Sequence, residues 1–123
     1  MSFVKDGPLH VILWEFQARH GQEAEFEQAY GPDGVWASFF RQGEGFLGTE
    51  LWRDQEKVGR YITVDRWTTR EAFEIFRAGH LEEYQTVDRR CEMLTERECH
   101  LGSFTSVEAA SVSTLPFDSG LKR

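Results

Sequence analysis

Two stretches of this sequence place apolar side chains on both faces of what would be a β-strand. Residues 9–19 read LHVILWEFQAR and residues 58–67 read VGRYITVDRW, and both are rich in the β-branched and aromatic residues typical of strands. Successive side chains of a strand point to opposite faces, so Val11 and Leu13 would oppose Ile12. Both faces of such a sheet would be apolar, so both must be covered by other parts of the protein or by a partner.

The other patterned segments predict a single α+β domain with βαββαβ order. After the first strand, the predicted elements are helices at 22–30 and 35–41, strands at 46–54 and 58–67, a helix of about 20 residues that begins near 68, and a strand at 93–104. The two central strands are joined by the polar residues 54–57, which favours an antiparallel hairpin.

The long helix has a start signal and a weak point. Thr68-Thr69-Arg70-Glu71 fits a capping box, in which a Thr hydroxyl accepts from the amide three residues on and Glu71 reaches back to the amide of the cap. Apolar residues then recur at helical spacing as far as Cys91. Gly79 interrupts this stripe, and we expect the helix to bend or restart there.

The helices can cover only one side of a four-stranded sheet. The other apolar side therefore needs a partner, and a second copy of the chain paired by two-fold symmetry is the most economical one. The alternative is a monomer in which loops or the tail cover that face. We take residues 1–104 as the domain and 105–123 as a tail, partly ordered or wrapping the dimer, with Leu115 and Phe117 as its anchors.

Charge and composition exclude several classes of partner. A net charge of −7 would repel nucleic acid. No apolar run approaches the roughly 20 residues of a membrane span, and residues 1–8 lack a signal peptide's pattern, so a cytoplasmic protein with no membrane partner is expected. The two cysteines, Cys91 and Cys99, favour reduced thiols. No metal-ligand spacing or Gly-rich phosphate loop is present, which predicts no metal and no nucleotide cofactor.

A resemblance to a known family rests on the middle of the chain. The strand that ends in Trp67, the Thr-x-x-Glu helix start after it, and His80 thirteen residues beyond Trp67 resemble the antibiotic biosynthesis monooxygenase family. The resemblance covers roughly residues 9–104. It implies a ferredoxin-like antiparallel sheet with helices on one face, which pairs into a dimeric α+β barrel.

The family contains more than one activity. Some members oxidise polyketide anthrones or quinols without metal or flavin, some degrade haem, and some have no known activity. The haem-degrading members are similar in having a Trp at the position of Trp67 and a His at that of His80, but they also use an Asn. This chain contains no asparagine, which argues against haem degradation.

The candidate catalytic residues are His80 and Trp67. An imidazole titrates near neutral pH, so His80 can move a proton to or from a bound phenol, or it can be a core histidine satisfied by a carbonyl or by Tyr84. Trp67 can stack on a planar ligand or fill the core. Trp52 and Tyr84 are candidate substrate-binding residues, and Trp14, Trp36, Phe39, Phe40 and Phe46 can line an aromatic pocket or pack the core.

Three carboxylates interrupt apolar strands: Glu15, Glu50 and Asp65. A carboxylate in a partly apolar site has a raised pKa and becomes a usable base, although salt bridges to nearby arginines would be the simpler explanation. The leading hypothesis is a cofactor-independent monooxygenase for a planar phenol, anthrone or quinol. The alternatives are a non-catalytic dimeric module that binds a small ligand or serves in assembly, and a cofactor-free isomerase or cyclase.

Overall fold

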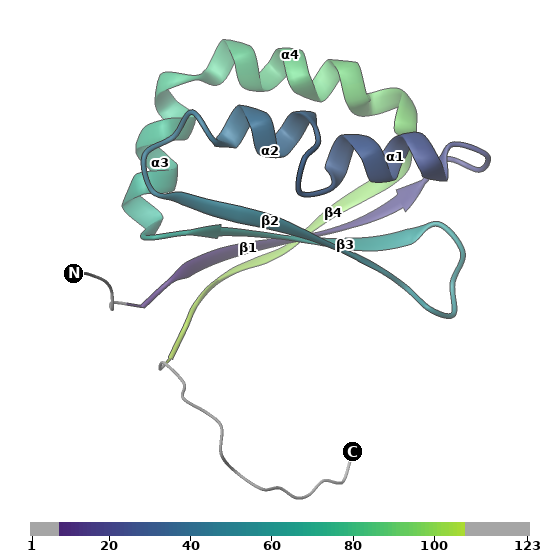
Figure 1. The fold of residues 1–123 in the computed structure, drawn as a ribbon, viewed down its shortest axis with the longest axis horizontal. Helices are drawn as coiled ribbons and strands as arrows, with labels where there is room; N and C mark the ends of the chain where they lie inside the picture. The colour runs from purple at the N-terminus through teal and green to yellow at the C-terminus, as the bar shows by residue number, and fades with distance from the viewer. Residues whose placement is uncertain (1–7, 108–123) are drawn as a thin grey trace, which may run out of the picture.

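The computed structural model describes residues 8–107. Its elements in chain order are β1 (His10–Ala18), α1 (Glu23–Tyr30), α2 (Val35–Phe40), β2 (Phe46–Arg53), β3 (Arg60–Trp67), α3 (Arg70–Gly79), α4 (Leu81–Cys91), a 3-10 turn (Glu92–Leu94) and β4 (Thr95–Thr105). The strands form one antiparallel sheet in the order β2-β3-β1-β4. The predicted α+β class and element order are confirmed, and all helices lie on one side of the sheet (Figure 1).

The alternation of β3 decides which side chains meet the helices. Every second residue is buried, namely Tyr61, Thr63, Asp65 and Trp67, and the residues between them are only partly buried. Asp65 is flanked by Ile12 on β1 and by Thr49 on β2. The helix-facing core of the domain is mostly aromatic, and Thr49, Thr63 and Asp65 are buried polar residues within it.

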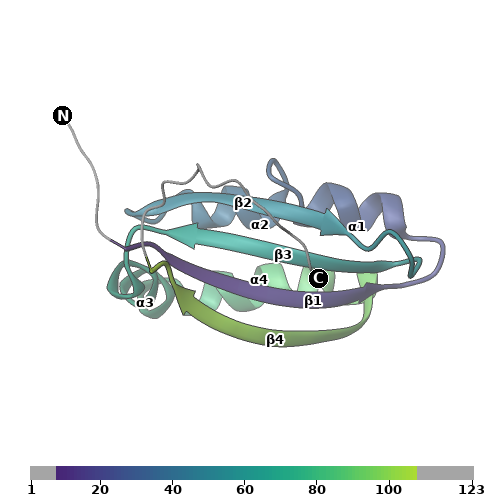
Figure 2. The same ribbon diagram turned by 90° about the horizontal axis from the view of Figure 1, so that it is seen from below.

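The opposite side of the sheet, here called the open face, carries the other set of side chains. Val11 and Leu13 on β1 and Ile62 and Val64 on β3 are partly exposed there. Figure 2 looks onto this side, with the strands in front and the helices behind them. No helix among residues 8–107 covers the open face, so the apolar surface expected from the sequence is present, and its pairing with a second copy stays a prediction.

The long helix differs from its prediction at its cap and agrees with it at its weak point. The hydroxyl of Thr69, rather than that of Thr68, caps α3 by accepting from the amide of Ala72 at 3.0 Å. Because Ala72 has no side-chain acceptor, the reciprocal half of a capping box cannot form. The helix also restarts at His80, next to the predicted weak point, and gives α3 and α4.

The last strand begins two residues later than predicted, because a 3-10 turn occupies Glu92–Leu94. Just beyond the C-terminal end of β4, the hydroxyl of Ser106 accepts a hydrogen bond from the amide of Leu9, which precedes β1, at 2.7 Å. The predicted anchors Leu115 and Phe117 lie outside the described residues. Of the helices that the structure describes, none is both long enough and apolar enough to cross a membrane.

Candidate functional site

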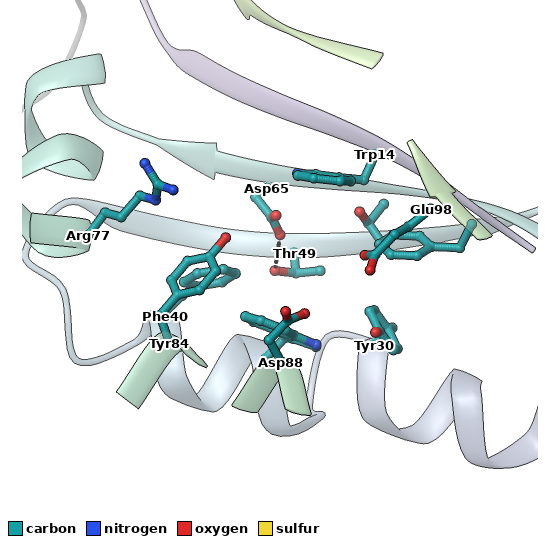
Figure 3. A pocket seen from close by; sticks show the side chains of 12 residues that line it. Trp14, Tyr30, Phe40, Thr49, Asp65, Arg77, Tyr84, Asp88 and Glu98 are labelled. Carbon is teal, nitrogen blue, oxygen red and sulfur yellow. Dashed lines mark hydrogen bonds between the residues drawn. The ribbon is translucent and has the colours of Figure 1, made fainter. Parts of the chain in front are cut away.

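A pocket of about 340 Å³ lies between the sheet and the helices. Its sheet side is formed by Trp14, Thr49, Thr63 and Asp65, and its helix side includes Tyr30, Trp36, Phe40 and Tyr84. Figure 3 shows Asp65 in the middle of this space, with Trp14 above it and the aromatic side chains of the helices below. We call this cavity the Asp65 pocket. Its volume and aromatic walls suit one small planar molecule.

Asp65 is the chemically distinctive group of this pocket. Its side chain is on the helix-facing side of β3, and the residue is 8% exposed. The hydroxyl of Thr49 donates to Oδ1 at 2.7 Å, and no other described residue donates to the carboxylate. Burial raises the pKa of Asp65 to about 6, against a lowering by the Thr49 hydrogen bond. Such a carboxylate is ionised at neutral pH and still accepts a proton better than an ordinary Asp.

Two phenols and an indole line the same pocket as this carboxylate. Burial raises the pKa of Tyr84 and that of Tyr30, so both keep their protons at neutral pH. The hydroxyl of Tyr84 points into the space between Asp65 and Arg77 (Figure 3). The indole Nε1 of Trp36 is buried within the protein and is not exposed to the open space of the pocket. The hydroxyl of Tyr84 is therefore the group among these three that can donate to a bound oxygen atom beside Asp65 (Figure 3).

The two ends of the pocket differ in charge. Arg77, on α3, is at one end, and Glu98, on β4, is at the other, with Asp88 of α4 near it (Figure 3). Desolvation, followed by the charge of Asp88, raises the pKa of Glu98. A ligand in the pocket therefore meets positive charge at the α3 end and negative charge at the β4 end.

His80 is outside the Asp65 pocket. It lines a second, shallower hollow of about 500 Å³ between residues 42–45 and α3, which we call the His80 hollow. Its Nδ1 is 2.9 Å from the carbonyl oxygen of Phe76, and its ring stacks on the Phe76 ring at 4.2 Å between centroids. This is the local carbonyl contact that the sequence offered as the structural alternative for His80.

Trp67 is fully buried, with 0% of its surface exposed. Its ring packs edge-on against Phe40, Phe46 and Phe73. Gly43 is so close that a β-carbon there would lie 3.0 Å from the Trp67 ring. Trp67 does not line either cavity, so in this structure it contacts no space that a ligand could enter without rearrangement.

Glu15, Glu50 and Trp52 belong to the open face. Glu15 accepts from Arg60 at 2.7 Å, and Glu50 accepts from Arg66 at 3.0 Å and from Trp52 Nε1 at 3.1 Å. These hydrogen bonds lower the pKa of both carboxylates. Neither glutamate is near Asp65, and their lowered pKa values make them weak bases.

The structure thus brings together Asp65 and Tyr84, and it places Trp14, Trp36 and Phe40 of the predicted aromatic lining in the same pocket. It adds Thr49, Arg77, Asp88 and Glu98, none of which was named. A signal for Arg77 and Asp88 was available, because they fall seven residues before and four residues after Tyr84 and so share a helical face with it. Within residues 8–107, no group of three or more His, Cys, Asp or Glu side chains is placed to hold a metal ion.

Comparisons with known proteins agree on one family. The family model described as antibiotic biosynthesis monooxygenase matches residues 9–87. Two solved structures of SnoaB, a cofactor-independent oxygenase from Streptomyces nogalater, are similar to the chain. The first, a mutant, is 26% identical with a TM-score of 0.68 and covers 82% of this chain and 95% of its own. The second is 29% identical with a TM-score of 0.62, and the match covers 83% of this chain and 96% of the SnoaB chain.

A structure from Deinococcus radiodurans shares the fold. It is a putative antibiotic biosynthesis monooxygenase, 17% identical with a TM-score of 0.66, and the match covers 85% of this chain and 99% of that chain. No curated protein sequence matches the chain.

Proposed function

This chain belongs to the antibiotic biosynthesis monooxygenase family, and we propose that it is a cofactor-independent monooxygenase that oxidises a planar phenol, anthrone or quinol with O₂. The observation that carries the proposal is Asp65, a buried carboxylate whose pKa is raised to about 6, inside an aromatic pocket of about 340 Å³. The likeness to SnoaB, a cofactor-independent oxygenase, supports the same reaction class.

In the proposed reaction Asp65 is the general base. The substrate lies flat in the pocket, and its phenolic or enolic O–H donates to the Asp65 carboxylate, which takes the proton. The hydroxyl of Tyr84 is the hydrogen-bond donor available to the oxyanion that forms (Figure 3). Fixed donors in a site that excludes water stabilise this anion without reorganisation. An electron-rich anion reduces O₂ more readily than the neutral phenol does.

The redox steps need only the substrate and O₂. The substrate anion passes one electron to O₂, and the resulting superoxide combines with the carbon radical to form a peroxide anion. For an anthrone, the O–O bond then breaks as the C–H proton leaves, which gives a quinone carbonyl and hydroxide. The hydroxide takes the proton held by Asp65 and departs as water, so one oxygen atom enters the product and the carboxylate is restored.

The other residues named from the sequence take different places in this proposal. Trp67 supports the pocket from within the core, through its contact with the pocket-lining ring of Phe40. His80 as the base is a competing hypothesis, and the experiments in the Discussion separate it from Asp65. A cytoplasmic location stays a prediction of the sequence.

The open face supports a homodimer as the working unit. Val11, Leu13, Ile62 and Val64 present apolar surface there, and the side chain of Phe104 on β4 is half exposed. Burial of this surface against a second copy would remove it from water. Sedimentation equilibrium at micromolar protein should give a mass near twice 14.3 kDa, and a mass near 14.3 kDa would contradict the dimer.

Oxygen uptake tests the reaction itself. Metal-stripped protein should consume O₂ in a saturable manner with members of a panel of anthrones and reduced naphthoquinones, and ¹⁸O₂ should place one labelled atom in the product. Heat-denatured protein is the control for autoxidation. Turnover without oxygen would indicate an isomerase or cyclase, and binding without turnover would indicate a ligand-binding module.

A further inference from the structure

The charged side chains of the Asp65 pocket are unevenly distributed. Arg77 is the cation among the residues that line it, whereas Asp65, Asp88 and Glu98 are acids. Within the described part of the chain, no carboxylate forms a salt bridge with Arg77. By contrast, Arg60, Arg66 and the neighbouring Arg70 on α3 all have one. Arg77 thus keeps its hydrogen-bond donors available at the pocket.

The guanidinium of Arg77 is positioned by an aromatic ring. Its Cζ lies 5.7 Å from the centre of the Tyr84 ring, within the range of a cation–π contact. The N–H bonds lie in the plane of the guanidinium, and the contact with the Tyr84 ring does not use them as hydrogen-bond donors. Figure 3 shows the Arg77 side chain directed toward the pocket at the α3 end, with the Tyr84 hydroxyl between it and Asp65.

Arg77 and Asp65 do not neutralise one another. No salt bridge joins them among the described residues, although the charges of both influence the pKa of Tyr84. The space between them is part of the pocket itself. A planar molecule that reaches from Asp65 to Arg77 would therefore meet a base at one point and an anion-binding group at another.

We propose that Arg77 is a specificity-determining residue that binds a carboxylate substituent of the substrate, so that the oxidised ring is placed at Asp65. This inference rests on the proposed function for its reacting ring, and it names the substrate class more closely as a planar phenol, anthrone or quinol that carries a carboxylate. The planar guanidinium matches a carboxylate with two parallel N–H donors.

The acidic end of the pocket fixes the direction in which such a substrate binds. Asp88 and Glu98 would repel a carboxylate placed at the β4 end, and they offer acceptors to hydroxyl groups there. A phosphate is disfavoured, because one arginine would face about two negative charges among three carboxylates. The charge pattern therefore selects a monoanion and one orientation.

Calorimetric titration with anthraquinone-2-carboxylate and with the neutral anthraquinone-2-carboxamide tests this inference without turnover. The two probes have the same ring system and nearly the same shape. The wild-type chain should bind the carboxylate about 10-fold or more tightly than the carboxamide, as expected for a charge-assisted bidentate contact. Added salt should reduce this preference.

Variants of Arg77 identify the group responsible. Arg77→Gln should abolish the carboxylate preference and leave carboxamide binding within about twofold, and Arg77→Lys should restore part of it. Arg70→Gln is the matched control, because Arg70 is on the same helix and does not line the pocket; it should keep the full preference. Equal affinity of the wild type for both probes, or binding of neither, would overturn the inference.

The outcomes separate this inference from the proposed function. A carboxylate preference that depends on Arg77, without oxygen uptake on any substrate, would leave the inference standing and remove the monooxygenase. Oxygen uptake with equal KM for carboxylated and neutral substrates would support the monooxygenase and overturn the role of Arg77. If the monooxygenase and the role of Arg77 are both correct, Arg77→Gln should raise KM for carboxylated substrates about 10-fold, the factor expected for the binding preference. It should change kcat less.

Discussion

The Asp65 pocket and the His80 hollow share no lining residue, and each contains one of the two competing candidates for the base. Asp65 is 8% exposed, and its one hydrogen bond from a described residue leaves Oδ2 free for a ligand. His80 is partly exposed, and its Nδ1 is used by the carbonyl of Phe76. The two groups therefore differ in burial and in how many acceptor atoms remain open to a ligand.

The hydrogen bond of His80 also fixes its tautomer. A carbonyl oxygen can only accept, so Nδ1 of His80 carries the proton and Nε2 is the basic atom. His80 lines the His80 hollow together with residues 42–45 and the exposed Ile75. It does not line the Asp65 pocket, so a substrate there would not contact this imidazole.

The largest expected effect separates the two groups by rate. Asp65→Asn keeps the shape of the side chain and can still accept from Thr49, but it cannot take a proton. It should lower kcat for oxygen uptake by about 10²- to 10³-fold. His80→Gln should change kcat by less than about threefold. Stopped-flow oxygen consumption with saturating anthrone measures both variants.

The reverse result would change the assignment. A loss of about 10²-fold in His80→Gln, with Asp65→Asn nearly unaffected, would make His80 the base, as the family resemblance first indicated, and would move the site to the His80 hollow. Circular dichroism of each variant should match the wild type, so that a rate loss reports chemistry rather than unfolding.

The fold was predictable because its signals are local. The alternation of residues 58–67 correctly separated Tyr61 and Trp67 from Ile62 and Val64, and Gly79 marked the place where the helix restarts. The capping residue was wrong by one position, because Thr68 and Thr69 are both suitable and only the chain path selects Thr69. Helix caps depend on such single-residue choices.

The site was harder to predict, although part of its signal was present. Asp65 falls two residues from Trp67 and four from Tyr61, so strand alternation places it on the helix-facing side, whereas Glu15 shares its side with Leu13. The sequence could not show how deeply Asp65 is buried or that Thr49 would meet it, because both depend on strand order and register. The same alternation could have set Asp65 apart from Glu15.

The second effect compares function with stability at Asp65. In the folded chain its pKa is raised to about 6, above the usual value of 3.8, so the native state binds a proton more tightly than the unfolded state does. Stability therefore falls as pH rises from about 4 to about 6. At pH 7 the ionised, buried Asp65 destabilises the fold by an amount on the order of 2–3 kcal/mol.

Asp65→Asn should therefore raise the free energy of unfolding at pH 7 by up to about 2–3 kcal/mol, while it lowers kcat by about 10²- to 10³-fold. Most of the gain should be gone at about pH 4, because the native carboxyl is then protonated and the unfolded one, with its usual pKa of 3.8, is about half protonated. Urea denaturation at pH 4 and pH 7 measures the difference. A variant that is less stable than the wild type at pH 7 would show that Asp65 is not a strained buried base.

The third effect is the pH dependence of the rate. Only ionised Asp65 accepts a proton, so kcat/KM should fall about tenfold per pH unit below the pKa of Asp65, which is about 6, and level off above it. A substrate that does not titrate between pH 4 and pH 8 is required. His80→Gln should keep this acidic limb unchanged, and a limb that vanishes in this variant would assign it to the imidazole.

The smallest effect tests the one hydrogen bond that Asp65 receives from the described residues. The hydroxyl of Thr49 stabilises the ionised carboxylate and lowers its pKa. Thr49→Val removes this donor with little change in shape, so the acidic limb of kcat/KM should move upward by about half a unit to one unit. At pH 6 the rate should then drop by about two- to fivefold, while at pH 8 it should stay close to that of the wild type.

Thr63→Val is the matched control for Thr49→Val. Thr63 also lines the Asp65 pocket and is equally buried on the sheet, but its hydroxyl makes no hydrogen bond with Asp65. Its replacement should leave the limb in place. An equal shift in both variants would mean that loss of pocket polarity, rather than the Thr49 hydrogen bond, moves the limb. An unchanged limb in Thr49→Val would show that the group titrating in the rate profile is not Asp65, and the comparison between the two cavities would have to be decided again from the His80 variants.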